Sequence, residues 1–347
     1  VKPDLGNASA GRTSNPCPTQ KKGTKVQKLF KAAVVAVITG LALAGCSPTQ
    51  DAKSVVLVTH DSFAMSDELI HKFESESGYQ LKIVKAGDAG TMTNKLILTK
   101  EQPIGDAVFG IDNTLIGLAE ENEILGSDLT PVDFGDVCMN YDIDWFAKNG
   151  LAAPTDIAQL TNPVYKNLTV VENPASSSTG MAFLATTVAK FGEDGYLNYW
   201  TKLKANGVKV AAGWEDAYFT DFSGSSGHGA YPLVLSYSSS PAYEVRDNGK
   251  SQTASILNDC YRQTEYAGVL AGAKNSRGAK ALVDFMISQE FQKALPESMY
   301  VYPARSGVDL PSDWEKFAPA ATTLVGGQLD VVAGRKTWIS KWSALFE

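Results

Sequence analysis

Through most of this chain, short β-branched apolar segments alternate with segments of helical periodicity. The first pair is an uncharged segment at 54–59, followed by a helix from about Ser66 that places Leu69 and Phe73 on one face and stops at Gly78. Such alternation predicts parallel strands with helices on both faces of the sheet. Further strands are predicted at 80–84, 106–110, 168–171, 208–211, 233–236 and 266–270, and further helices at 91–100, 180–191, 193–205, 276–288, 313–317 and 329–342.

The α/β pattern occurs twice, and no Pro-rich linker separates the two occurrences. A chain that crosses between two units at strands, rather than at a tether, forms two adjoining lobes. We expect one lobe from residues 54–136 together with 263–347, and the other from residues 137–262.

The charge of the chain restricts its partners. The chain has 31 Lys and Arg residues and 38 Asp and Glu residues, which gives a net charge of −7. Residues 1–45 carry seven basic residues and one acid, so the remainder is more acidic than the total indicates. This balance argues against nucleic-acid binding, which needs a basic footprint. It favours cations in any cleft of the body.

The N-terminal segment predicts the compartment. Basic residues precede an apolar run from Ala32 to Ala44, which is too short to cross ~30 Å of hydrocarbon. Residues 1–45 therefore indicate a secretory signal or leader. The sequence Leu-Ala-Gly-Cys ending at Cys46 resembles a bacterial lipobox, which implies a lipidated Cys46, a tether at 46–53 and an extracytoplasmic location at the membrane. An ordinary signal peptide or anchor with a chance cysteine is the alternative.

The remaining cysteines leave one question open. Cys17 lies in the leader, so Cys138 and Cys260 are the cysteines of the body. Outside the cytoplasm they could pair. Two buried thiols are the alternative, and the sequence slightly favours it.

Candidate ligand-binding residues follow the predicted strands. In open α/β sheets the ligand lies beyond the carboxyl ends of the strands. Carboxylates beside aromatic faces suit a cationic, partly aromatic ligand, because the ring faces attract the cation and the acid supplies the opposing charge. The residues at these ends are His60, Asp61, Asp88, Asp112, Ser177, Ser178, Trp214, Asp216, Tyr237 and Tyr243.

Structural roles are the alternative for each of these residues. Trp214 and Tyr243 fit a hydrophobic core, where aromatic residues are common. Asp61, Asp112 and the serines fit helix caps. An acid such as Asp216 stabilises the first turn of a helix without touching a ligand.

Several stretches, taken in order, resemble the thiamine-binding proteins of bacterial ABC importers. The resemblance covers most of residues 54–342, and its most specific part is the run Ser-Tyr-Ser-Ser-Ser-Pro-Ala-Tyr at 236–243. The other matching stretches are 60–63, 109–113, 133–135, 177–180, 213–218, 300–303, 319–324 and 338–342.

The resemblance implies roles for particular residues. Trp214, Tyr237 and Tyr243 fall where the family packs rings around thiamine, and Asp88 falls where an acid faces the ligand. Ser177 falls on the loop that meets the hydroxyethyl or phosphate end. Two ligand positions depart from the family pattern, since His60 stands in place of Tyr and Tyr300 in place of Trp.

The resemblance also implies a fold and partners. The expected fold is a two-lobed, periplasmic-binding-protein-like α/β fold, with each lobe a sheet flanked by helices and the ligand cleft between the lobes. The expected protein is a monomeric lipoprotein that delivers thiamine or its phosphates to an ABC permease and its ATPase. It needs no cofactor, metal or catalytic residue.

Two other functions stay open at this point. One is a binding protein for another cation, a polyamine or ferric iron. The sequence contains the acids and rings that polyamines need, but no adjacent pair of tyrosines of the kind that favours iron. The other is a secreted carboxylate-dependent hydrolase, which no motif excludes. Zinc-protease and Gly-x-Ser-x-Gly motifs are missing from the sequence.

Overall fold

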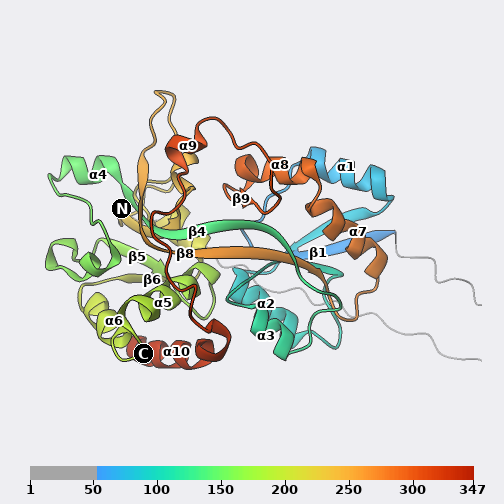
Figure 1. Ribbon diagram of the computed structural model, residues 1–347, viewed down its shortest axis with the longest axis horizontal. Helices are drawn as coiled ribbons and strands as arrows, with labels where there is room; N and C mark the ends of the chain where they lie inside the picture. Colours follow the sequence, from blue (N-terminus) through green and yellow to red (C-terminus); the bar gives the residue numbers. More distant parts are fainter. Residues whose placement is uncertain (1–52) are drawn as a thin grey trace, which may run out of the picture. The chain divides into compact units, whose positions relative to one another are not determined.

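The computed structural model describes residues 53–347 (Figure 1). The predicted leader at 1–45, Cys46 and all but the end of the predicted tether lie outside the described residues. The strands are β1 (Ser54–Thr59), β2 (Gln80–Lys85), β3 (Ala107–Asp112), β4 (Thr130–Asp142), β5 (Thr169–Glu172), β6 (Lys209–Ala211), β7 (Leu233–Tyr237), β8 (Thr253–Val269) and β9 (Tyr302–Pro303).

Helices follow most of these strands, close to the predicted bounds. Helix α1 begins at the N-cap Ser66, whose side chain accepts a hydrogen bond from the Leu69 N–H, and ends at Gly78 in the left-handed conformation. The α-helices are α1 (Asp67–Ser77), α2 (Ala89–Leu98), α3 (Ile116–Glu121), α4 (Ile143–Lys148), α5 (Ser178–Phe191), α6 (Tyr196–Ala205), α7 (Ser276–Met286), α8 (Gln289–Ser298), α9 (Trp314–Phe317) and α10 (Val331–Phe346). The shorter helical segments are the 3-10 helices η1 (Ile157–Thr161), η2 (Pro163–Tyr165) and η4 (Ser240–Ala242) and the π-helix η3 (Asp216–Asp221).

The strands form one mixed sheet in the order β2-β1-β3-β8-β4-β7-β5-β6, with β9 paired to β4. β1 pairs in parallel with β2 and β3, and β5 pairs in parallel with β6 and β7. β4 and β8 run between these two groups, antiparallel to each other and to the neighbours β7 and β3. The predicted parallel pairing therefore holds within each group but not for the whole sheet.

β4 and β8, called here the crossing strands, pass side by side through the middle of the sheet (Figure 1). The sequence predicts no strand over β4 and only the end of β8. Both strands carry polar residues that are fully buried, such as Asp133 and Asp136 on β4 and Gln263 on β8. Neither strand therefore has the apolar run or the regular alternation by which a strand is recognised.

A disulfide joins the crossing strands. Cys138 on β4 and Cys260 on β8 are bonded, with their Cα atoms 4.7 Å apart. The preference of the sequence analysis for two buried thiols is therefore wrong. The pairing depends on a bulge: Met139 faces Ile256 while Val137 faces Tyr261, so the extra residues of β8 bring Cys260 beside Cys138.

The first parallel group is held between two cores. Val55, Leu57 and Phe109 pack with α1, α7 and α8 on one face of the sheet, whereas Val58 and Val108 pack with α2 and α3 on the other. This alternation follows from the two-residue period of a strand. It fixes the end of β1, from which the loop with His60 and Ser62 leaves.

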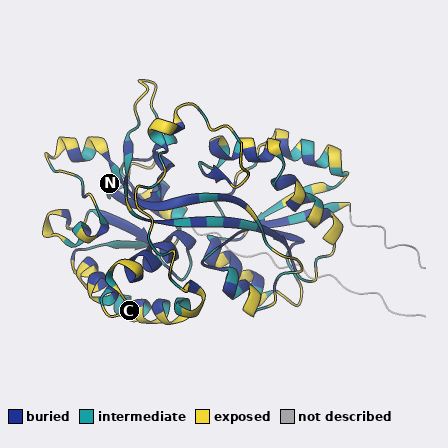
Figure 2. Ribbon diagram, in the orientation of Figure 1, coloured by how far each residue is buried: buried dark blue, intermediate teal, exposed yellow. Residues whose placement is uncertain are grey.

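The second parallel group packs against α5, α6 and α10. Trp342 of α10 meets Trp200 of α6 edge-on, with ring centroids 5.5 Å apart. The predicted lobe ranges place α10 in the lobe of residues 54–136 and 263–347. The described chain forms one compact unit, so these lobe ranges stay a prediction. In Figure 2 the strands are largely buried and the outer faces of the helices are exposed. Within residues 53–347 no helix combines the length and hydropathy that crossing a membrane requires.

Candidate ligand-binding site

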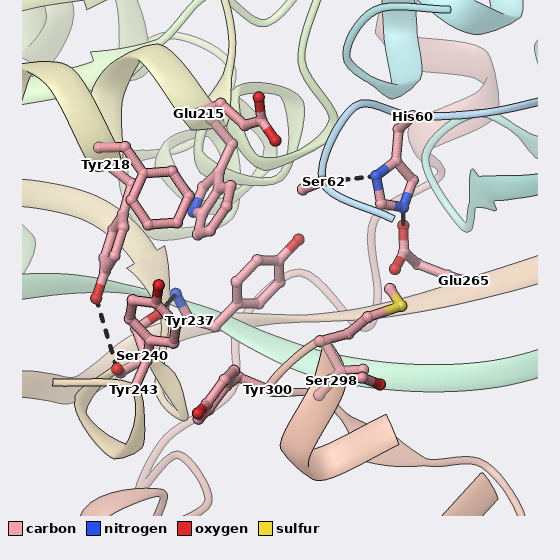
Figure 3. A pocket seen from close by; sticks show the side chains of 14 residues that line it. His60, Ser62, Glu215, Tyr218, Tyr237, Ser240, Tyr243, Glu265, Ser298 and Tyr300 are labelled. Atoms are coloured by element: carbon pink, nitrogen blue, oxygen red, sulfur yellow. Dashed lines mark hydrogen bonds and ion pairs between the residues drawn. The ribbon is translucent and has the colours of Figure 1, made fainter. Parts of the chain in front are cut away.

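Segments from both parallel groups and from a crossing strand surround one cavity, called here the aromatic cavity (Figure 3). Because it touches both groups, a ligand there would contact both predicted lobes. Its lining residues are His60, Ser62, Trp214, Glu215, Tyr218, Phe219, Tyr237, Ser240, Tyr243, Glu265, Ser298, Met299, Tyr300 and Val301.

Six aromatic rings form a continuous wall of this cavity. Trp214 stacks on Tyr218, with ring centroids 5.0 Å apart and planes 14° from parallel. Phe219 stands edge-on to Trp214 and also meets Tyr243. Tyr243 in turn stands perpendicular to Tyr300, with centroids 5.0 Å apart. Tyr237 completes the wall, 6.4 Å from Trp214. Such a wall offers several negative ring faces to a cation.

Hydrogen bonds fix two of these rings. The indole Nε1 of Trp214 donates to Ser236 Oγ at 2.9 Å, and the hydroxyl of Tyr237 donates to Gln263 Oε1 at 2.9 Å. Burial raises the pKa of Tyr237 well above its usual value, and the charges of Glu265 and Asp88 raise it further. Tyr237 is therefore a neutral donor at physiological pH.

His60 and Glu265 form the charged part of the cavity. His60 Nε2 lies 3.3 Å from Glu265 Oε1, and both side chains are largely buried. Ser62 Oγ lies 2.9 Å from His60 Nδ1. Burial lowers the pKa of His60. Glu265 raises it through its charge and its close contact with the imidazole, Asp88 and Asp61 add smaller contributions, and together they leave this pKa raised above 6.5.

Two further acids stand behind Glu265. Asp112 on β3 and Asp133 on β4 are its partners in the sheet register, and both are fully buried. Burial is the main cause that raises the pKa of Asp112 to about 7. Burial and the neighbouring Glu265 raise the pKa of Asp133 well above its usual value. Asp112, Asp133 and Glu265 together therefore carry fewer than three negative charges at neutral pH. Of these three acids, Glu265 lines the cavity.

Asp88 lies in a second pocket beside the first. This acidic pocket contains Asp61, Asp88, Glu215 and Asp216, and shares Ser62, Trp214 and Glu215 with the aromatic cavity. Asp88 caps α2 through the Ala89 N–H at 2.6 Å and accepts the Trp214 N–H at 2.8 Å. Burial raises the pKa of Asp88, whereas these hydrogen bonds lower it. Its oxygens are thus engaged by the backbone.

The remaining predicted residues lie outside both pockets. Ser177 precedes α5 and shares a hydrogen bond with Thr179, and the Ser178 N–H lies 3.4 Å from Asp88 Oδ1. Asp112 accepts bonds from the N–H and hydroxyl of Thr114. Five predicted residues share the aromatic cavity: His60, Trp214, Tyr237, Tyr243 and Tyr300.

Sequence reasoning missed nine of the 14 lining residues, among them the rings of Tyr218 and Phe219 and the buried acid Glu265. Glu265 lies inside β8 rather than after a strand, so the rule of strand ends does not find it. The signal for Glu265 is that the buried acids Asp112 and Asp133 face it on the two neighbouring strands. That pairing is known only once the sheet has folded. Among residues 53–347 no cluster of three or more His, Cys, Asp or Glu side chains could hold a metal ion.

Comparison with known proteins places the chain in a family. Residues 118–327 match the family described as bacterial extracellular solute-binding protein. The chain belongs to that family. Its members bind solutes for transport and are not a class of enzymes, and the predicted two-lobed α/β solute-binding fold is confirmed.

Several known proteins resemble the chain over most of its length. The thiamine-binding periplasmic protein of Escherichia coli K12 is 31% identical over 317 residues, which cover 86% of this chain and 95% of that protein. The Salmonella typhimurium protein of the same name is 30% identical with the same coverage. A solved structure named periplasmic thiamin binding protein has a TM-score of 0.73 at 27% identity, covering 85% of this chain and 96% of the other.

Proposed function

We propose that this protein captures thiamine, or a thiamine phosphate, outside the cytoplasm and delivers it to the permease of an ABC importer. The observation that carries the proposal is the aromatic cavity, in which six rings surround a space that also contains the carboxylate of Glu265. Its relatives named as thiamine-binding proteins support the choice of ligand.

The chemistry of thiamine matches this lining. The thiazolium ring is a permanent cation, and the aminopyrimidine is a flat ring with hydrogen-bonding edges. A cation over a Trp or Tyr face gains ~0.5–2 kcal/mol, more when water is excluded. Trp214 and Tyr237 offer such faces, and Glu265 offers the opposing charge.

Ligand capture would follow from a shift between open and closed arrangements of the lobes. A ligand that touches both lobes makes its full set of contacts only when they are closed, so it favours the closed state. The lining of the aromatic cavity by His60 and Glu265 on one side and Trp214 and Tyr243 on the other supports this mechanism. The permease would recognise the closed form.

We further propose that a lipid on Cys46 holds the protein at the outer face of the membrane as a monomer. It acts without a cofactor and without catalysis, and thiamine is its cargo. Replacing Cys46 by Ser is expected to move the protein from the detergent phase to the aqueous phase in detergent partitioning. Retention in the detergent phase would contradict the anchor.

Titration of the purified protein tests the ligand. We expect thiamine to change the tryptophan fluorescence, because Trp214 lines the cavity, and to raise the melting temperature by mass action. Thiamine monophosphate and diphosphate are titrated in parallel to rank the phosphorylation states. Spermidine and ferric citrate serve as controls for the alternative cations. A response to spermidine or iron with none to the thiamine compounds would refute the proposal. A separate incubation tests the hydrolase alternative, and an unchanged mass of the ligand would count against it.

A further inference from the structure

The ring of His60 is held firmly against the charged side of the aromatic cavity. It packs on Phe109, with ring centroids 5.5 Å apart, and on Gly110. A Cβ at position 110 would lie 2.3 Å from His60 Cδ2, and the backbone there has φ +99°, so the site depends on glycine. His60 therefore has little freedom to turn away from Glu265.

His60 stands out by its charge. Among the described residues that line the aromatic cavity, it is the only one with a basic side chain. Its Nε2 atom is buried and makes no aligned hydrogen bond, although it lies 3.3 Å from Glu265 Oε1. The contact is therefore strongest while the imidazole is protonated, when the two side chains carry opposite charges.

Acids face His60 from three parts of the chain. Glu265 approaches from β8, Asp88 from the N-terminus of α2, and Asp61 from the loop of His60 itself. Behind Glu265 stand Asp112 on β3 and Asp133 on β4. These groups favour a cation beside Glu265, whether that cation is a proton on His60 or a charge on a ligand.

We propose that His60 carries a proton in the ligand-free protein and releases it when a cationic ligand binds, so that the cavity exchanges one positive charge for another. This inference rests on the proposed function, because thiamine supplies the permanent cation. Two cations in one partly desolvated cavity repel each other strongly. Imidazolium is the cation that can be discharged near neutral pH. His60 thereby determines which ligand charge the cavity accepts.

The exchange makes binding depend on pH in a defined direction. While His60 is protonated, each bound cation releases a proton, so affinity rises up to about tenfold per pH unit. Above the pKa of His60, which is raised above 6.5, the affinity levels off. Acidification lowers the affinity. A neutral derivative of thiamine, such as its tricyclic oxidation product thiochrome, displaces no proton and shows no such dependence.

Isothermal titration calorimetry measures the exchange directly. Thiamine is titrated at about pH 6 in buffers of different ionisation enthalpy, and the slope of heat against that enthalpy counts the protons released. We expect up to about one proton per thiamine for the wild-type protein. The substitution His60→Asn should abolish the release. His71→Asn is the matched control, because His71 is exposed on α1 and should leave the count unchanged.

The outcomes separate the two proposals. Thiamine binding with no proton release in the wild-type protein would overturn the exchange and leave the proposed function intact. The same release in His60→Asn would also overturn it. Absence of thiamine binding across the whole pH range, in calorimetry and in thermal shift, would overturn the proposed function and the exchange together. The wild-type proton count needs no variant, so a folding defect in His60→Asn does not decide the question.

Discussion

The carboxylate of Asp88 accepts a hydrogen bond from the backbone N–H of Trp214 at 2.8 Å, across 126 residues of sequence. The same carboxylate caps α2 through the Ala89 N–H and lies 3.4 Å from the N–H of Ser178 at the start of α5. One side chain therefore ties the loop after β2 to two segments of the second parallel group. Asp88 sets the position of Trp214 as well as the charge near it.

Replacing Asp88 by Ala should destabilise the protein and weaken ligand binding. The substitution removes a helix cap and the bond to the Trp214 N–H, for a loss of about 1–3 kcal/mol in the free energy of unfolding. Urea unfolding measures the loss. Asp88→Ser is the variant to compare with Asp88→Ala, because serine can cap α2 but is too short to reach Trp214. An Asp88→Ser protein as stable and as tight-binding as wild type would show that the link to Trp214 contributes nothing.

Replacing Trp214 by Ala should weaken thiamine binding about tenfold or more, since one cation–ring contact and the stacked support of Tyr218 are lost. Trp214→Phe should lose less, because it keeps a ring face but not the bond from Nε1 to Ser236. Calorimetric titration gives the affinities. Trp145→Phe, on α4 and outside both pockets, is the control. Wild-type affinity in Trp214→Ala would exclude this ring from the site.

Trp214, Tyr237 and Tyr243 could be predicted as cavity residues from the sequence, whereas Tyr218, Phe219 and the acid Glu265 were not predicted. Trp214, Tyr237 and Tyr243 follow strands or end them, and a parallel sheet gathers such positions at one edge. Glu265 lies inside β8, where its partners depend on the register against β3 and β4. No local pattern encodes that register, because the crossing strands pair residues far apart in the chain.

The disulfide shows the same limit. Cys138 and Cys260 are 122 positions apart and come together only because β8 bulges opposite β4. A bulge shifts the pairing by residues that no periodicity reveals. By contrast, the ends of α1 were predictable, because a capping serine and a terminal glycine act within a few residues.

Breaking this disulfide should cost about 2–5 kcal/mol of unfolding free energy, because the bond closes a long loop in the unfolded chain. The measurement compares urea unfolding of the Cys17→Ser, Cys46→Ser chain with and without the further substitutions Cys138→Ser and Cys260→Ser. In the first chain, thiol counting in denaturant should find no free thiol. Two reactive thiols there would mean that the bond does not form.

The buried acid Asp112 predicts a specific pH dependence of stability. Its pKa is raised to about 7 in the folded protein, mainly by burial, whereas an aspartate in an unfolded chain titrates near 3.9. Between these two values the folded state holds a proton that the unfolded state has lost. Stability from this group therefore falls as pH rises from about 4 to about 7, by up to about 1.4 kcal/mol per pH unit.

Asp112→Asn removes this dependence while keeping an oxygen that can accept from Thr114. Other buried acids also make the free energy of unfolding depend on pH. The difference in this free energy between variant and wild type therefore isolates the contribution of position 112. We expect the stability of Asp112→Asn relative to wild type to increase steadily between about pH 4 and pH 7 and to level off above that range. Urea unfolding at a series of pH values measures this difference. A difference that does not change with pH would mean that Asp112 is already ionised in the folded protein, because only a group that keeps its proton on folding produces the slope.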